Sequence, residues 1–91
     1  MKEFLKALQE GKKIEMWYDS GGHRGDAFII PEDDHYVYCF RHESFSDPDA
    51  EGRRIKVAES DNCFRIDLKE AEKLLEAWKN NLNARIRIVN S

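Results

Sequence analysis

The chain has 91 residues and a mass of 10.7 kDa, which is the size of one domain. Leu, Ile, Val and Phe supply 21 of these residues, and 36% of the residues are charged, although the net charge is only −3. This composition excludes collagen-like, coiled-coil, low-complexity and multi-domain proteins. We therefore expect residues 1–91 to form a single domain around one small core.

The first half of the chain begins with a helical pattern and continues with strand patterns. Phe4, Leu5 and Leu8 lie at helical spacing within residues 2–10, and Gly11 follows at the position of a helix C-cap. The next apolar runs alternate or are rich in aromatic and β-branched residues, which is typical of strands. These runs predict strands over residues 14–18, 27–30 and 35–41.

The second half predicts a loop, two strands, a helix and a final strand. The loop covers 42–52, and the strands cover 53–59, 63–66 and 85–89, with a turn at Ser60, Asp61 and Asn62. Asp67 and Glu70 have the spacing of a capping box, which predicts the start of a helix over 67–83. The expected fold is therefore α+β: an antiparallel sheet of about five to six strands, a short N-terminal helix, and the longer amphipathic helix packed on one face.

The charges are distributed unevenly along the chain. Residues 1–31 are neutral, residues 32–52 carry −6, and residues 53–91 carry +3. The acidic segment is either a solvated loop or a docking surface for a protein partner with a basic surface. The docking hypothesis makes Phe45 an apolar anchor within a rim of four carboxylates. These are Glu43, Asp47, Asp49 and Glu51.

The glycine-rich run 20–26 supports an alternative function. Its glycines and Arg24 suit an anion, a nucleotide or a single-stranded nucleic acid, although a plain hairpin connection is the favoured explanation of the run. The full alternative site would combine His23 and Arg24 with Arg85 and Arg87. A pI near 5.6 places nucleic acid second among the partners.

The aromatic face of Tyr36, Tyr38 and Phe40 has two interpretations. We expect it to pack against the longer helix, at Leu74, Leu75 and Trp78, as part of the core. Exposed, the same rings would be a platform on which bases could stack.

Metal binding and catalysis have weak support. His35, Cys39 and His42 would not share one face of a strand, so no metal site is expected. Cys39 and Cys63 lie in apolar runs and are expected to be buried free thiols, while a bridge would need their strands to be neighbours. Since no catalytic motif occurs, we expect neither an enzyme nor a cofactor.

The termini and the overall profile complete the predictions. No secretory signal or membrane-spanning run is present in the sequence, which predicts a cytoplasmic protein without membrane contact. In size, acidity and lack of a catalytic motif, the chain resembles the small inhibitor proteins that phages encode, such as anti-CRISPR proteins. A homodimer could form if the final strand or the 27–30 strand were an unpaired sheet edge.

Overall fold

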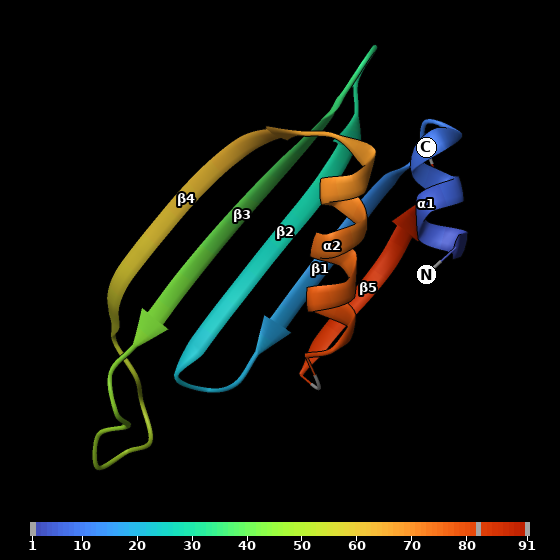
Figure 1. Ribbon diagram of the computed structural model, residues 1–91. Helices are drawn as coiled ribbons and strands as arrows, with labels where there is room; N and C mark the ends of the chain where they lie inside the picture. The colour runs from blue at the N-terminus through green and yellow to red at the C-terminus, as the bar shows by residue number, and fades with distance from the viewer. Residues whose placement is uncertain (1, 82, 91) are drawn as a thin grey trace.

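The computed structural model describes residues 2–81 and 83–90 and has the α+β fold that the sequence predicts (Figure 1). The elements in chain order are α1 (Lys2–Gln9), β1 (Lys13–Asp19), β2 (His23–Pro31), β3 (Tyr36–Phe45), β4 (Lys56–Ile66), α2 (Leu68–Lys79) and β5 (Ala84–Val89). The five strands form one sheet in the order β4-β3-β2-β1-β5, and every neighbouring pair is antiparallel. No helix of the described ranges is long and apolar enough to cross a membrane.

The helix α1 ends where the sequence predicts, at a glycine cap. Gly11 has a φ of 88°, a left-handed conformation that glycine adopts without strain. Its N–H donates to the Leu8 carbonyl at 3.1 Å, and the Lys12 N–H donates to the Ala7 carbonyl at 2.9 Å. This pair of hydrogen bonds is a Schellman motif, which satisfies the last carbonyl groups of the helix and directs the chain into β1.

The helix α2 begins at the predicted capping box. The Glu70 N–H donates to the Asp67 carboxylate at 2.8 Å, and the Asp67 N–H donates back to the Glu70 carboxylate at 3.1 Å. The helix ends at Lys79, four residues before the predicted position of 83, because Asn81 turns the chain with its side chain, which accepts from the backbone N–H two residues on. Leu82, which the prediction placed on its apolar face, lies outside the described residues.

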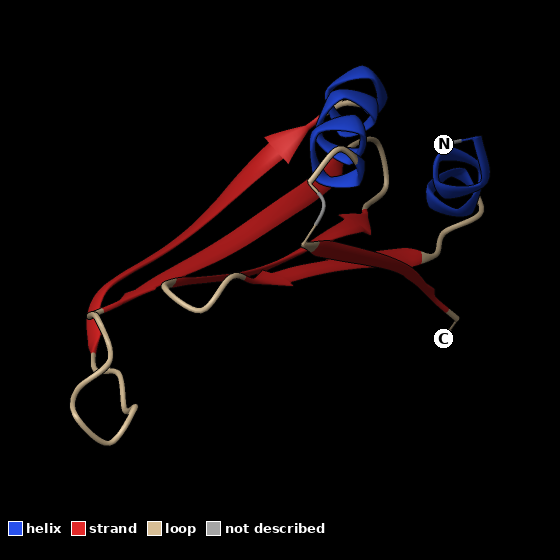
Figure 2. Cartoon of the chain, turned by 90° about the horizontal axis from the view of Figure 1, so that it is seen from below, coloured by secondary structure: helices blue, strands red, loops and turns tan. Residues whose placement is uncertain are grey.

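The core lies between the helices and one face of the sheet (Figure 2). Trp78 of α2 donates its ring N–H to the Tyr38 hydroxyl of β3 at 3.1 Å, inside the core. Tyr38 is buried, and Tyr36 and Phe40 are half-buried beside the core. The prediction that this aromatic face packs against α2 is therefore confirmed.

Residues 56–66 form one continuous strand, so the prediction of two strands, over 53–59 and 63–66, separated by a turn is wrong. Ser60 lies opposite His42 and Asn62 lies opposite Phe40, both in the β3–β4 register. Polar residues are tolerated in β4 because both of its faces are exposed along almost its whole length.

One predicted loop is shorter than expected, and another lies further along the chain than expected. Pairing between β2 and β3 continues until His23 lies opposite Ser44. The predicted glycine loop 20–26 is therefore a turn of residues 20–22, and the connection predicted at 42–52 runs over 46–55. Extended by this pairing, β2, β3 and β4 run past the helices and give the molecule a longest dimension of 50 Å (Figures 1 and 2). We call the far end, comprising the turn 20–22, the adjoining strand ends and the loop 46–55, the distal end.

Candidate interaction surface at the distal end

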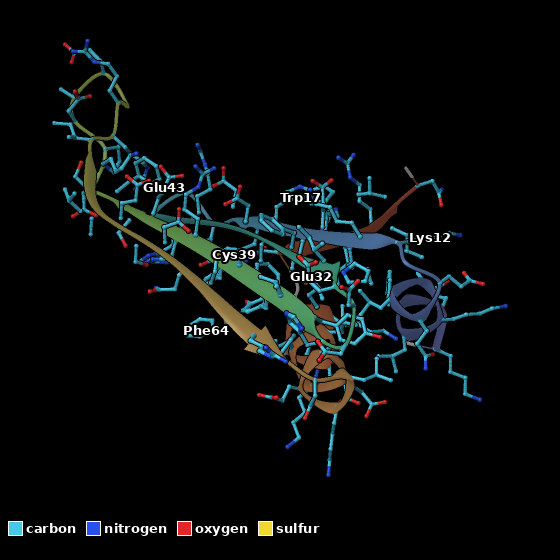
Figure 3. All side chains as sticks on the ribbon, turned by 90° about the horizontal axis from the view of Figure 1, so that it is seen from above. Lys12, Trp17, Glu32, Cys39, Glu43 and Phe64 are labelled. Carbon is cyan, nitrogen blue, oxygen red and sulfur yellow. A yellow bond between two sulfur atoms is a disulfide. The ribbon has the colours of Figure 1, made fainter. Side chains whose placement is uncertain are left out.

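The fold splits the acidic segment between two ends of the sheet. Glu32, Asp33 and Asp34 belong to the β2–β3 turn, whereas the loop 46–55 lies at the distal end, and Figure 3 shows Glu32 and Glu43 well apart. The ten residues of β3 lie between them and span about 30 Å. Since charges in physiological salt are screened beyond about 8 Å, the two acidic groups do not act as one patch.

One carboxylate of the acidic turn, Asp34, has partners within its own end of the sheet. Asp34 contacts the His35 ring nitrogen at 2.7 Å and Arg65 at 3.5 Å. The hydrogen bond from His35, followed by the charge of Arg65, lowers the pKa of Asp34.

The distal end brings the predicted glycine loop and the predicted acidic loop together. The Phe45 N–H donates to the Gly22 carbonyl at 2.8 Å, so the turn 20–22 continues the sheet beside the end of β3. The Arg24 guanidinium lies over the Phe45 ring, 5.3 Å from its centroid. Arg24 and Phe45 belong to the two rival site predictions, and here they are neighbours in one surface.

Most of the predicted rim carboxylates have partners within the fold. Glu43 contacts Lys56 at 2.9 Å with a side chain that is only 13% exposed, and this hydrogen bond lowers the pKa of Glu43. Glu51 pairs with Arg53 at 2.9 Å. Asp49 accepts from the backbone N–H groups of Glu51 and Arg53, at 3.0 Å and 2.8 Å, and shapes the loop.

Asp47 differs from the other predicted rim acids. Within residues 2–81 and 83–90 it makes no ion pair at 4 Å or less, and its side chain is exposed. Of the four predicted rim acids, Asp47 therefore has the charge that is most available to a partner.

Two exposed apolar side chains, which the sequence prediction did not assign to the site, lie beside this rim. Ile55 is 72% exposed and Val57 is 64% exposed, the highest values among the exposed large hydrophobic residues described. Val57 lies at an irregularity in the β3–β4 register next to Phe45. Their alternation in the sequence predicts an ordinary strand. A strand with one side against the core would have buried them, so their exposure became visible only in the fold.

The alternative anion site is not assembled. His23 lies on the helix side of β2, where it stacks on His42 with ring centroids 5.3 Å apart, whereas Arg24 points to the opposite face. Arg85 and Arg87 do share one face of β5, as predicted, but Arg87 is held by Glu15 at 2.6 Å and 2.9 Å. The strand β1 separates both arginines from β2.

The uncovered face of the sheet carries a shallow depression. Trp17 and Phe28 lie in it, bordered by ion pairs of Glu15 with Arg87 and of Asp26 with Arg41. The arrangement offers aromatic surface and paired charges.

Cys39 and Cys63 lie on the uncovered face of the sheet, which carries the depression, and form a disulfide. The prediction of free thiols is therefore wrong. The two cysteines lie directly opposite each other in neighbouring antiparallel strands. Each of the three candidate metal ligands has another contact: His35 contacts Asp34, Cys39 forms the disulfide, and His42 stacks on His23 on the helix side. No group of three or more metal-ligating side chains occurs among the residues described.

A scan against protein-family models and searches of curated proteins and of solved structures find no match for this chain.

Proposed function

We propose that this protein is a small non-enzymatic interaction module that binds a protein partner through its distal end. The observation that supports this proposal is the exposure of Ile55 and Val57, two positions apart in the chain, on a segment that extends beyond the helix-covered core. Protein interfaces combine an apolar centre with a polar rim, and the charged side chains around these residues supply such a rim. Exposed apolar side chains gathered in one place are typical of interaction sites.

The rim favours a partner with basic groups near its own apolar centre. Asp47, Asp49 and Glu51 lie in the loop 46–55, with only Arg53 and Arg54 to offset them there. Exposed charges of this kind act mainly on the rate of association and on the salt dependence of binding. Glu43 has a different role in this proposal, because its contact with Lys56 makes it part of the fold rather than a partner contact.

Inhibition of a target protein is the form of this activity that the chain's profile favours. An inhibitor that works by covering a surface on its target needs a projecting apolar patch and no reacting groups. The distal end provides such a patch on a chain of 91 residues, in keeping with its resemblance to phage-encoded inhibitors.

The test starts from proteins of the source cell that the immobilised wild-type chain retains. Each is purified and titrated against matched variants. Ile55→Ser combined with Val57→Ser should weaken binding at least about tenfold, since fully burying a Val or Ile side chain contributes about 1.5–3 kcal/mol. Trp17→Ser is the control, because Trp17 is 40% exposed on the uncovered face of the sheet. Equal affinities of wild type and the distal variant, or a loss with the Trp17 variant alone, would contradict the proposal.

The partner's charge preference is tested separately. Asp47→Asn should reduce the dependence of the association rate on salt, because it removes one exposed charge without an internal partner. Glu43→Gln is the matched control and should leave that dependence unchanged. A salt dependence that falls with Glu43→Gln and not with Asp47→Asn would show that the rim has been assigned wrongly.

A further inference from the structure

The strand β4 is the outer strand of the sheet and is exposed on both faces. Of its eleven residues only Ile66 is buried. Phe64 is 54% exposed and lies opposite Tyr38, on the helix side of the sheet (Figure 3). An edge strand of this length presents a row of unpaired backbone N–H and C=O groups, which another strand can pair with.

The register with β3 shows which backbone groups of β4 face outward. The Cα atoms of Cys39 and Cys63 are 4.0 Å apart, close to the narrow spacing of a non-hydrogen-bonded antiparallel pair. The N–H and C=O of Cys63 therefore point away from β3. Because the direction alternates along a strand, those of Glu59, Asp61 and Arg65 point outward as well.

We propose that a second copy of this chain pairs with β4, antiparallel, about a two-fold axis at Asn62. In this register, Glu59 of each copy lies opposite Arg65 of the second copy, and Arg65 is also diagonal to Asp61. Residues 58–66 of one copy pair with residues 66–58 of the other. The outward backbone N–H and C=O groups of the two strands then form hydrogen-bonded pairs. The helices of both copies lie on the same side of the joined sheet.

Charge selects this register from its neighbours. A two-fold axis at Asp61 would place that carboxylate opposite its own copy, and an axis at Ser60 would place Glu59 opposite Asp61. Like charges that are directly opposite each other destabilise a sheet. An axis at Cys63 avoids this conflict but pairs a shorter segment. The axis at Asn62 therefore gives the longest pairing without opposed like charges.

The required side chains are at the surface and available. Arg65 is 68% exposed and its only ion pair in the described ranges is with Asp34 at 3.5 Å, while Glu59 is 46% exposed and lies 3.3 Å from Lys56. Exposed contacts of this kind are weak and exchange readily.

The other edge of the sheet is unsuited to the same pairing. The β5 strand has six residues, and Arg85 and Arg87 point to one face. An axis at Ile86 would place Arg85 opposite Arg87, and an axis at Arg87 would place that residue opposite itself. The 27–30 segment, also considered as an edge, lies inside the sheet within β2. Self-pairing is therefore assigned to β4.

Sedimentation of the full chain with its disulfide intact, over a series of concentrations, tests this proposal. We expect a species of twice the 10.7 kDa mass. Arg65→Glu should weaken dimerisation roughly tenfold, since it turns two attractive cross-strand pairs into repulsive ones. Combining it with Glu59→Arg should restore the dimer, which a variant that merely misfolds would not do. Arg85→Glu, the same charge change on the opposite edge, should leave the dimer unchanged.

A backbone test supplements the charge test. Asp61→Pro removes an outward N–H that β3 does not use, so the monomer should keep its circular dichroism spectrum while the dimer is lost. Asp61→Ala is the matched control and should retain the dimer. A chain that stays monomeric at every concentration would overturn the proposal. A dimer that is equally stable in the wild type, Arg65→Glu and Asp61→Pro would also overturn it. So would the formation of filaments that are lost in Arg85→Glu.

Discussion

The disulfide between Cys39 and Cys63 should be a major source of stability for the outer part of the sheet. The strand β4 buries a single residue, Ile66, so apolar packing does little to hold the strand in place. The bridge links positions separated by 24 residues. In the chain-entropy model, closing a loop of this length in the unfolded state stabilises the fold by about 3.5 kcal/mol. Replacing both cysteines by serine should therefore remove about that amount from the free energy of unfolding.

Urea unfolding measures the loss. For a small domain, 3.5 kcal/mol corresponds to a shift of the midpoint by roughly 1 to 3 M urea. The wild-type chain treated with a reductant should show the same shift as the Cys39→Ser, Cys63→Ser variant, because both lack the bridge. Hydrogen exchange should locate the effect in β4, with Ile29 in the core still protected. Unfolding midpoints that coincide for the oxidised, reduced and serine forms would refute the argument.

Three further perturbations probe the core and the charged contacts. Tyr38→Phe leaves the buried ring N–H of Trp78 without its acceptor, and urea unfolding should show a loss of about 1–3 kcal/mol. Gly25→Ala would place a Cβ against the Tyr18 ring, closer than van der Waals contact, and should cost about 1–3 kcal/mol by the same assay. The cost should be smaller in a chain that also carries Tyr18→Ala. The pKa of Glu43 is lowered by its hydrogen bond with Lys56, so its contribution is present above the unfolded pKa and is lost as the pH falls through the folded one. As the pH is lowered below about 4.3, the melting temperature should therefore fall less steeply for Glu43→Gln than for the wild type.

Local sequence signals predicted the parts of the fold that local chemistry determines. The capping box of Asp67 and Glu70 fixes the start of α2, and Gly11 fixes the end of α1, because each acts on hydrogen bonds within a few residues. The α+β class followed from the order of these segments. The aromatic run around Tyr38 predicts a core position, because aromatic side chains bury large areas and dominate the energetics of a core.

The sequence could not predict features that depend on which strands are neighbours. Ser60–Asn62 have the composition of a turn, and only pairing with β3 keeps them extended. The disulfide between Cys39 and Cys63 also depends on the pairing of β3 with β4. The apolar residues that surround each cysteine in the sequence do not reveal this pairing. Ile55 and Val57 have a strand-like pattern in the sequence. They are exposed because β3 and β4 extend beyond the part of the sheet that the helices cover.

The distribution of charge shows the same limit for the candidate site. Along the chain, residues 32–52 form one acidic block of −6. In the fold, the β2–β3 turn and the loop 46–55 lie at opposite ends of β3, and Glu43 between them is neutralised by Lys56. The net charge summed over residues 32–52 therefore exceeds the negative charge that a partner would meet at either end of β3. The acidic block still includes the loop in which the exposed Asp47 lies.

The two proposals together have a geometric consequence. Antiparallel pairing at β4 directs the two distal ends to opposite ends of the dimer, so the dimer would carry two separated copies of the loop 46–55. Two sites on one body raise the apparent affinity for a partner displayed at high density by up to about 10²–10⁴, provided that the spacing allows both to engage. Arg65→Glu should then speed dissociation from a densely coated surface and leave binding to a single dissolved partner unchanged. If wild type and variant dissociate at the same rate from the coated surface as well as from the dissolved partner, the edge strand and the distal end act independently.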